Sequence, residues 1–341
     1  MSNRIVVGLS GGVDSSLAAL RLREAGREVW GVWLDLGIGS PEKARAAAAQ
    51  LGVGFSVFDA AAAHESLVRV PFAEAYRSGL TPNPCAVCNP TVKLPSLLRA
   101  AEALGAERIA TGHYAAVEQK NGRPCLRRSG GDKDQSYMLA LVGPELLERL
   151  ELPLAGLTKP EVRALAAERG LLAAGAGDSQ DICFIPGGDY GAWLEARGMG
   201  LPPGDFTDGT GRVLGRHRGL HRYTVGQRRG LGVSAPTRLY VCALDRDSGS
   251  ILLGPEEKLL TDTAYIKDVL WGAMAPAAGP FSCEVKTRSR PTRYPAEVSP
   301  LGAGLALRFA SPLRRPAPGQ LAVGYDPEGF VLFAGTVAEE P

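Results

Sequence analysis

The sequence predicts an α/β protein with a doubly wound parallel sheet at its N-terminal end, followed by two small β-rich domains, the last of them a β-barrel. Three observations lead to this prediction. Strand-like and helix-like segments alternate up to about residue 192, which is typical of a parallel sheet with helices on both faces. Beyond that residue, Gly and Pro separate short β-type runs. The length of 341 residues suits two or three domains.

The N-terminal elements follow from local patterns. A helix over residues 14–25 has apolar residues at three- and four-residue spacing. In the next helix, Ser40 is the expected N-cap, Pro41 the first residue, and Gly52 lies beyond the end. Apolar runs predict four strands, at residues 5–9, 28–36, 53–58 and 108–111.

The remaining elements divide the chain into domains. Thr158 and Glu161 form a capping box that opens a helix ending near Gly170. Six β-type runs follow, at residues 239–244, 250–253, 282–287, 305–309, 320–325 and 330–337. We therefore expect an α/β domain over residues 1–192 and two β-rich domains, over residues 193–259 and 260–341.

Composition excludes several classes of protein. With 45% hydrophobic and 22% charged residues, the chain can bury a core and is not intrinsically disordered. No run of about 18 apolar residues exists, so we expect no membrane span. The first residues lack the apolar stretch of a signal peptide, which predicts a cytoplasmic protein. Six cysteines are too few for a disulfide scaffold.

Basic residues gather in two windows although the net charge is only +2. Residues 212–229 contain six arginines together with His217 and His221, and no carboxylate. Residues 286–315 contain seven Lys/Arg against Glu297 alone. Such stripes favour a polyanion partner such as nucleic acid, and the alternative is a solvated surface.

A glycine-containing loop follows the first strand. It reads Ser10-Gly11-Gly12-Val13-Asp14-Ser15-Ser16 and leads directly into a helix. Paired glycines let the backbone approach a ligand closely, and the free N–H groups of the helix start bind phosphate. No GKS or GKT follows, so this is not a Walker loop. A structural turn is the alternative to nucleotide binding.

The cysteines allow several interpretations. Cys85 and Cys88 form a CxxC in a Pro-flanked segment, which we expect to be a loop. Such a pair can be a redox pair, half of a zinc site, a set of cluster ligands or without function. Cys183 taken alone resembles a small buried hydrophobe, and the other three cysteines are expected in the core, at Cys125, Cys242 and Cys283.

Several segments together resemble a known family. The loop after the first strand resembles the pyrophosphate loop, or PP-loop, of ATP pyrophosphatases. Six segments in order resemble the tRNA-specific 2-thiouridylases over residues 4 to about 337, at residues 8–16, 81–89, 111–114, 133–137, 178–185 and 223–231.

This resemblance implies roles for particular residues. Cys88 matches the nucleophile and Cys183 the persulfide carrier. The ATP-binding positions are Gly8, Leu9, Ser10, Gly11, Gly12, Val13, Asp14, Ser15, Leu34 and Gly112. The target-base positions are Asn83, Pro84 and Cys85. The tRNA-binding positions are His113, Lys133, Asp134, Gln135, Arg288, Ser289 and Gln320.

One departure from the family pattern concerns Cys85. Many family members have Asp at this position, so this chain lacks a carboxylate that could transfer a proton there. The change also allows Cys85, Cys88 and Cys183 to converge as ligands of a [4Fe–4S] cluster with one open iron. Sulfur would then be delivered either as a protein persulfide or as cluster-bound sulfide.

The resemblance implies ATP-dependent 2-thiolation of the wobble uridine in the anticodon stem-loop of tRNA. ATP and Mg²⁺ are the expected cofactors, with tRNA and a sulfur-donor protein as partners. Two alternatives remain at this stage. One is an amide-forming synthetase with the same loop, and the other is an RNA-binding protein that only senses ATP.

Overall fold

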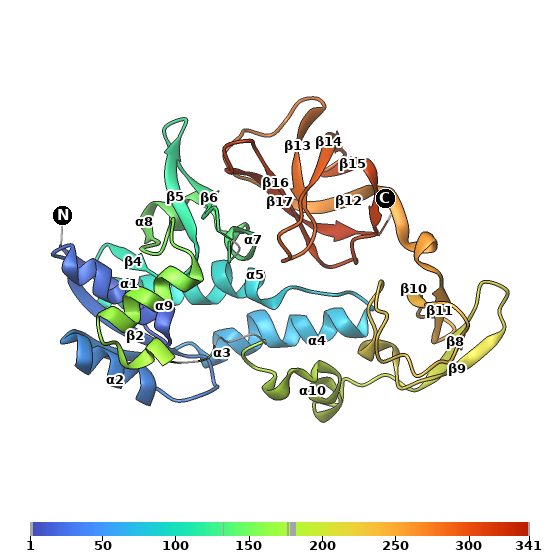
Figure 1. The fold of residues 1–341 in the computed structure, drawn as a ribbon, viewed down its shortest axis with the longest axis horizontal. Helices are drawn as coiled ribbons and strands as arrows, with labels where there is room; N and C mark the ends of the chain where they lie inside the picture. The colour runs from blue at the N-terminus through green and yellow to red at the C-terminus, as the bar shows by residue number, and fades with distance from the viewer. Residues whose placement is uncertain (1–2, 132, 176, 178–181, 340–341) are drawn as a thin grey trace.

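The chain forms three parts, named here by their order in the sequence (Figure 1). The computed structural model describes residues 3–131, 133–175, 177 and 182–339. The N-terminal part is a helix-covered sheet, the middle part is a small open sheet, and the C-terminal part is a closed barrel. Helices α4 (Val70–Arg77) and α10 (Tyr190–Ala196) both contact the middle part.

The N-terminal sheet is buried on both faces. Its strands run in the order β3-β2-β1-β4-β7, and each of these pairings is parallel. In the central strand β1 (Arg4–Gly8), Val6 packs with helix α6 (Leu94–Ala103), whereas Val7 packs with helix α1 (Val13–Glu24). This two-sided burial is the property of a doubly wound sheet and confirms the predicted fold class. The other strands are β2 (Glu28–Asp35), β3 (Gly54–Asp59), β4 (Arg108–Ala110) and β7 (Leu150–Glu151).

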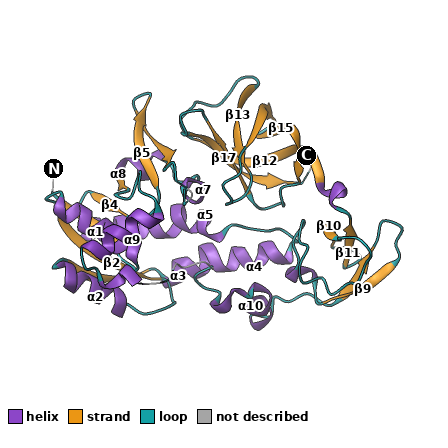
Figure 2. Ribbon diagram, viewed as in Figure 1, coloured by secondary structure: helices purple, strands orange, loops and turns teal. Residues whose placement is uncertain are grey.

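Helical segments surround this sheet (Figure 2). Two helical runs contain π-type turns, which join α3 to α4 and α5 to α6. An antiparallel hairpin of β5 (Ala115–Lys120) and β6 (Arg123–Arg128) follows β4. The helical elements not yet given are α2 (Glu42–Leu51), α3 (Ala61–His64), η1 (Glu65–Arg69), α5 (Pro84–Cys88), η2 (Asn89–Lys93), α7 (Ser136–Leu139), α8 (Pro144–Arg149), α9 (Lys159–Glu168), η3 (Leu172–Gly175) and η4 (Pro186–Gly188).

The two β-rich parts have different topologies. The middle sheet has the order β10-β11-β8-β9, and the C-terminal barrel closes as β12-β15-β14-β13-β16-β17. The middle part consists of β8 (Gly204–Thr207), β9 (Val213–His217), η5 (Leu220–Arg222), β10 (Tyr240–Asp245), β11 (Ser250–Gly254) and η6 (Glu256–Leu259). The barrel consists of β12 (Leu260–Trp271), β13 (Phe281–Lys286), β14 (Tyr294–Leu301), β15 (Gly304–Arg314), β16 (Leu321–Tyr325) and β17 (Val331–Ala338).

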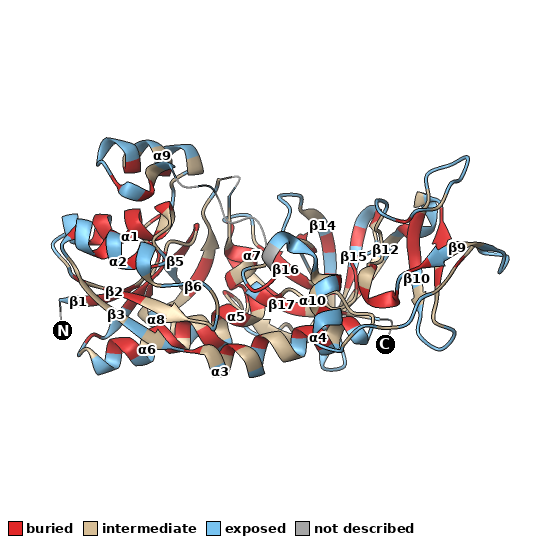
Figure 3. Ribbon diagram, turned by 90° about the horizontal axis from the view of Figure 1, so that it is seen from below, coloured by how far each residue is buried: buried red, intermediate tan, exposed pale blue. Residues whose placement is uncertain are grey.

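The barrel shares a hydrophobic core with the N-terminal part. Val323 and Tyr325 of β16 belong to the same buried cluster as Leu97 of α6 and Tyr137 of α7. Figure 3 shows buried segments of β16 and β17 beside α5 and α7. The Tyr137 hydroxyl also donates a hydrogen bond of 2.9 Å to the Leu321 carbonyl. Because shared apolar burial stabilises the contact, the barrel is held against the N-terminal part.

Three local expectations were wrong. Pro41 itself is the N-cap of α2, although Gly52 ends the helix in the left-handed conformation as expected. The CxxC forms helix α5, because the Asn83 side chain caps it by accepting a hydrogen bond from Ala86 N. Cys183 is exposed. Among the other cysteines, Cys125 and Cys242 are buried as expected, and Cys283 is only partly buried.

The described residues contain no helix with the length and apolarity that a membrane span requires.

Candidate active site

The loop between β1 and α1 is folded around its serine hydroxyls. Ser15 Oγ lies 3.0 Å from Ser10 Oγ and donates to the Gly12 carbonyl at 3.1 Å. Gly11 has a φ of +78°, and a Cβ there would lie 2.4 Å from the Lys43 backbone. Only glycine fits this position, so the tight turn that frees the amides at the start of α1 depends on it.

A second glycine allows β4 to end against the same helix. A Cβ on Gly112 would lie 2.8 Å from Ser15 N and 2.7 Å from the Asp14 carbonyl carbon. Both atoms are backbone, so neither can move aside cheaply. The carboxyl ends of β1 and β4 therefore meet at the start of α1, which is where doubly wound sheets bind ligands.

Asp14 is held by two partners that the sequence analysis did not assign to the site. Lys159 Nζ donates to both carboxylate oxygens, at 2.7 and 2.8 Å. The Tyr114 hydroxyl donates to Oδ1 at 2.6 Å. Lys159 is the first residue of α9, and the capping box of Thr158 and Glu161 fixes that helix start. The capping box was visible in the sequence, but its spatial relation to Asp14 was not.

These elements enclose a cavity of about 420 Å³. Seven of the ten predicted ATP-binding residues line it, namely Gly8, Leu9, Ser10, Asp14, Ser15, Leu34 and Gly112. Gly11, Gly12 and Val13 form the turn and the helix start. Further lining residues that were not predicted for ATP are Val32, Trp33, Leu36, Ile38, Lys93, Leu97, Thr111, His113 and Gln135. Polar groups at one end and apolar side chains elsewhere suit a nucleotide.

Cys88 lies at the end of α5 in a separate apolar cluster. It is 6% exposed and packs in one cluster with Phe184 and Ile185, the two residues after Cys183. Leu36 and Ile38, which line the cavity, also pack against this cluster. The segments that carry the two cysteines therefore meet beside the cavity, although 95 positions separate them in the sequence.

The three candidate thiols differ in environment. All are free, and Cys85 and Cys183 are exposed. Burial raises the pKa of the Cys88 thiol to about 11, Lys93 opposes this shift, and Cys183 and Cys85 add to it. Desolvation also raises the pKa of Cys183, and Cys85 adds to that shift. Cys85 and Cys183 are thus near enough to Cys88 to raise the pKa of its thiol. Residues 178–181 of the same predicted motif lie outside the described residues.

The arrangement does not fit the predicted cluster. Within the described part of the chain, no group of three His, Cys, Asp or Glu side chains is close enough to hold a metal ion. We derive no chemical step through a cluster.

Comparisons with known proteins identify the chain's relatives. The family model "tRNA methyl transferase HUP domain" matches residues 3–187, "tRNA methyl transferase PRC-barrel domain" matches 195–255, and "Aminomethyltransferase beta-barrel domain" matches 261–336. The tRNA-specific 2-thiouridylase MnmA of Roseiflexus castenholzii is 41% identical, over 99% of this chain and 100% of that protein. The chain belongs to the tRNA-specific 2-thiouridylase family. The MnmA protein of Geobacter metallireducens is 42% identical over 94% of this chain and 93% of its own length.

Two of the residues expected to contact tRNA, His113 and Gln135, lie at the nucleotide cavity. Thr111 Oγ1 lies 2.7 Å from His113 Nδ1, and burial, followed by Lys93, lowers the pKa of His113 to about 3. Gln135 exchanges hydrogen bonds with the backbone of Tyr114, at 3.0 Å through its side chain and 2.7 Å through its N–H. His113 is therefore neutral and Gln135 is fixed at the cavity wall.

Asp134 lies between the N-terminal part and the barrel and contacts both. The neighbouring Lys133 is exposed. The Asp134 side chain is only 6% exposed, and its Oδ2 lies 3.7 Å from Lys286 Nζ in the barrel. Ser136 Oγ donates to the same oxygen at 2.9 Å. Asp134 therefore joins the N-terminal part to the barrel in this structure.

The barrel residues of the family pattern also face other parts of the protein. Gln320 Nε2 donates to the Thr81 carbonyl at 2.7 Å. Arg288 is half-buried, and its Nη2 donates to the Arg315 carbonyl at 3.4 Å. Ser289 is exposed. Gln320 therefore joins the barrel to the N-terminal part, and a Cβ on Gly226 of the middle part would lie 3.7 Å from Arg288 Nη2.

The arginine-rich window of the middle part is only partly exposed. His217 and His221 are each 1% exposed, and burial lowers the pKa of His217. Arg222 is paired with Glu195 and Asp189. The remaining basic side chains of this window are exposed, at Arg212, Arg216, Arg218, Arg228 and Arg229. The window thus contributes a smaller basic surface than its composition predicted.

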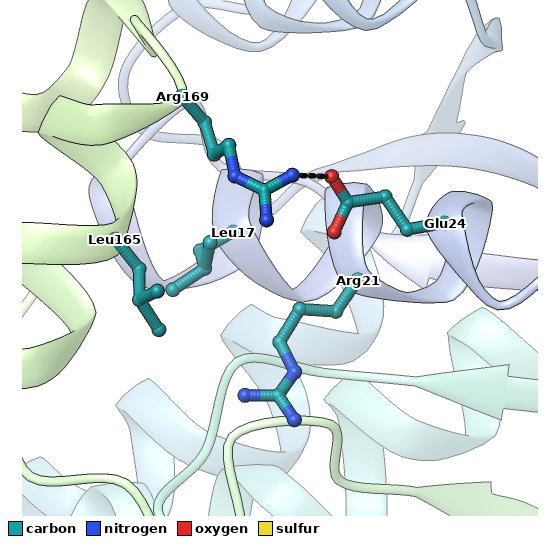
Figure 4. Close-up of a pocket in the computed structure, with 5 residues that line it drawn as sticks. All are labelled: Leu17, Arg21, Glu24, Leu165 and Arg169. Atoms are coloured by element: carbon teal, nitrogen blue, oxygen red, sulfur yellow. Dashed lines mark hydrogen bonds and ion pairs between the residues drawn. The ribbon is translucent and has the colours of Figure 1, made fainter.

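A separate cleft of about 270 Å³ lies between α1 and α9 (Figure 4). Arg169 forms an ion pair with Glu24 across it, and Leu17 and Leu165 form its floor. Glu24 is the last residue of α1, so the cleft lies toward the opposite end of that helix from Asp14. The ion pair between Arg169 and Glu24 holds α9 against α1, and Lys159 is the first residue of α9.

Proposed function

We propose that this chain catalyses ATP-dependent 2-thiolation of the wobble uridine of tRNA. One observation supports this most directly. Leu36 and Ile38 line the nucleotide cavity and also pack against the apolar cluster that contains Cys88. An adenylating pocket and a pair of thiols on neighbouring segments are what replacement of oxygen by sulfur requires. We propose domain boundaries at residues 192 and 259, and the nucleotide loop, Cys88 and Cys183 then all lie in the first domain.

ATP would bind with its phosphates at the start of α1. The loop amides and the hydroxyls of Ser10 and Ser15 would hold the departing pyrophosphate. Asp14, positioned by Lys159 and Tyr114, would orient the metal–phosphate complex. Mg²⁺, when bound, neutralises developing charge on the phosphate oxygens. The adenosine would contact Leu34 and Gly112, which line the cavity.

The first chemical step activates the base. The C2 oxygen of the uridine attacks the α-phosphorus of ATP, a new O–P bond forms, and the bond to pyrophosphate breaks. The product is an O2-adenylated uridine with AMP as its leaving group. The uridine must leave its stack to reach the cavity, which costs least in a single-stranded anticodon loop. Asn83, Pro84 and Cys85 at the start of α5 would contact the base.

The second step transfers sulfur. The terminal sulfur of a persulfide on Cys183 attacks C2 and displaces AMP, which leaves a disulfide between the uridine sulfur and Cys183. The Cys88 thiolate then attacks the Cys183 sulfur and releases 2-thiouridine. A Cys88–Cys183 disulfide forms, and an external dithiol must reduce it before the next turnover. A sulfur-donor protein, such as a cysteine desulfurase or a relay, supplies the persulfide.

The [4Fe–4S] cluster suggested by the sequence can be tested directly against the persulfide route. Replacing Cys85 with aspartate removes the third thiolate but restores the residue that many family members have. The persulfide route predicts that Cys85→Asp still produces 2-thiouridine. The cluster route predicts that anaerobically purified protein contains iron and acid-labile sulfide, and that Cys85→Asp loses both together with thiolation.

The basic surfaces of the middle and barrel parts would bind tRNA phosphates. Exposed arginines such as Arg228 and Arg229 suit such contacts. The residues of the family pattern would act at the junction, namely His113, Lys133, Asp134, Gln135, Arg288, Ser289 and Gln320.

The decisive experiment incubates the full chain with ATP, Mg²⁺, a persulfide donor and an unmodified tRNA transcript. We expect pyrophosphate release that depends on the tRNA, and a mass increase that corresponds to one oxygen replaced by sulfur. A transcript with cytidine at the wobble position is the matched control. Pyrophosphate release without 2-thiouridine, but dependent on an amine donor, would indicate an amide-forming synthetase. ATP binding without pyrophosphate release would indicate an ATP-sensing RNA-binding protein.

A further inference from the structure

Lys93 lies between the nucleotide cavity and the cysteines. It is the last residue of the π-type turn η2, which joins the cysteine helix α5 to α6 on the sheet. Pro90 within this turn has no backbone N–H, and π-type turns occur often at functional sites. The Lys93 side chain is half-buried and lines the cavity together with Ser10 and Ser15.

The charge of Lys93 is not neutralised by any carboxylate of the residues that the structure describes. Asp14 lines the same cavity, but it is bonded to Lys159 and Tyr114. Among the residues that the structure describes, no carboxylate lies within ion-pair distance of Lys93. A partly buried cation is costly unless an anion accompanies it. This environment is therefore suited to an anion supplied by the substrate.

Lys93 also acts on both thiols of the sulfur-transfer pair. Its positive charge opposes the burial-driven rise in the pKa of Cys88 and of Cys183. The backbone N–H of Lys93 further stabilises the Cys88 thiolate. The same ammonium group adds to the lowering of the pKa of His113 on the cavity wall. One cation therefore reaches the nucleotide cavity and both sulfurs.

We propose that Lys93 is a catalytic cation that serves both halves of the reaction in turn. During adenylation its ammonium group contacts an α-phosphate oxygen of ATP. During sulfur transfer it stabilises the negative sulfur of Cys88 or of the Cys183 persulfide. This inference rests on the proposed function and adds to it a residue that links the two steps.

Lysine suits this double role because the two steps are sequential. The ammonium group is a compact charge with three donors on a flexible stem, so it can follow the negative charge from phosphate to sulfur. Neither step requires Lys93 to gain or lose a proton. Arginine in its place would keep the charge and most of the function, although its planar group reaches a different set of positions.

The test compares Lys93→Met with Lys93→Arg, using Lys267→Met on the exposed barrel surface as the matched control. Loss of a preorganised donor to developing charge costs about 10²–10³-fold in rate. We expect single-turnover pyrophosphate release to fall by about that factor in Lys93→Met and to recover by tenfold or more, roughly, in Lys93→Arg. The thermal transition should not fall in any of the three variants, because within the described part of the chain Lys93 forms no ion pair whose loss would destabilise the fold.

A second measurement does not need the reaction. Alkylation of each thiol by iodoacetamide is followed by mass spectrometry of the peptides, with Cys283 as internal reference. Without Lys93 the pKa of both thiols should rise, which lowers their thiolate fraction and slows alkylation of Cys88 and Cys183 at neutral pH. Unchanged alkylation and unchanged pyrophosphate release in Lys93→Met would overturn the proposal. Wild-type protein that releases no pyrophosphate would instead overturn the proposed function, while the alkylation result would still decide the electrostatic role of Lys93.

Discussion

The side-chain amide of Gln320 donates a hydrogen bond of 2.7 Å to the main-chain carbonyl of Thr81, 239 positions earlier in the chain. Thr81 N–H in turn donates to the Pro318 carbonyl at 2.8 Å. Gly319 has a φ of +89°, and a Cβ there would lie 3.0 Å from Thr81 N. The barrel loop thus holds both polar groups of the Thr81 backbone. Thr81 lies just before Asn83, the N-cap of the cysteine helix, so the barrel sets where that helix begins.

The first prediction concerns this contact. Gln320→Ala removes one hydrogen bond with a net value of about 1 kcal/mol, which corresponds to roughly a fivefold change in an equilibrium. We expect the thiolation kcat at saturating tRNA to fall about fivefold, because the cysteine helix is less often in position. Gln119→Ala on the exposed β5 hairpin is the control. An effect confined to the KM for tRNA would instead show that Gln320 acts by contacting tRNA.

The sequence predicted the nucleotide loop because its chemistry is local. The two glycines, the serines and the helix that follows lie within one short segment, and their geometry depends little on the rest of the chain. The turn at Gly11 and the capping box at Thr158 were predictable for the same reason. By contrast, the contact between Lys159 and Asp14 depends on where α9 packs, which no local pattern specifies.

The sequence could not predict contacts that the barrel makes with the first domain. Strand β14 was missed because it contains Pro295 and Pro300, which resemble turn signals, and β12 was missed because it mixes polar and apolar residues without a continuous apolar run. Asp134 and Lys286 meet only after the barrel docks. Lys93 was overlooked because a lysine on a helix is usually a solvated surface residue.

The second prediction concerns the cysteine pair. We expect Cys88→Ser and Cys183→Ser each to abolish formation of 2-thiouridine, because serine can neither carry sulfane sulfur nor be oxidised to a disulfide. Both variants should still release pyrophosphate once per bound tRNA, since adenylation precedes sulfur transfer. Cys283→Ala is the control, because burial raises the pKa of that thiol to about 12. Full thiolation in either serine variant contradicts the proposed route.

The third prediction concerns Arg288. A residue that contacts one phosphate changes the slope of log K against log salt by about one. We expect Arg288→Ala to reduce the slope by about that amount for every substrate tRNA, because phosphate contacts carry no sequence information. Arg21→Ala on the exposed side of α1, outside both basic windows, is the matched control. Titrations at several salt concentrations measure the slope, and an unchanged slope excludes a phosphate contact by Arg288.

The fourth prediction concerns the acid stability of the junction between α10 and the middle part. Hydrogen bonding from Arg222 is the main cause that lowers the pKa of Glu195 from 4.5 to about 2. A carboxyl group with a lowered folded-state pKa stabilises the fold above its unfolded pKa, and this contribution is lost as pH falls from 4.5 toward 2. Because Glu195 is 43% exposed, solvent screening limits the contribution to below about 1 kcal/mol.

Glu195→Gln should therefore lower the thermal midpoint slightly at neutral pH, and the difference from wild type should vanish near pH 2. Glu257→Gln is the control, since that side chain is exposed. Melting curves across this pH range decide the matter. A difference that persists unchanged at low pH would mean that the carboxylate charge of Glu195 contributes nothing to the junction.

The last prediction tests whether Asp134 serves the fold as well as tRNA binding. Its carboxylate faces Lys286 Nζ at 3.7 Å, and both side chains are nearly buried. Burial lowers the pKa of Lys286, and Asp134 opposes that shift, so the pair compensates its own desolvation. Removing one partner of a buried pair leaves the other charge uncompensated, at a cost of about 3–5 kcal/mol.

We therefore expect Lys286→Met to reduce the free energy of unfolding by about 3 kcal/mol, whereas Lys286→Met combined with Asp134→Asn should lose less than the sum of the single changes. Denaturant titration of the four proteins completes the cycle. Ser289→Ala on the barrel surface is the comparison, because its exposed side chain should affect tRNA affinity without affecting stability. If Asp134→Asn weakened tRNA binding while leaving stability unchanged, Asp134 would act on tRNA directly, and the other contacts of the barrel would be enough to hold it in place.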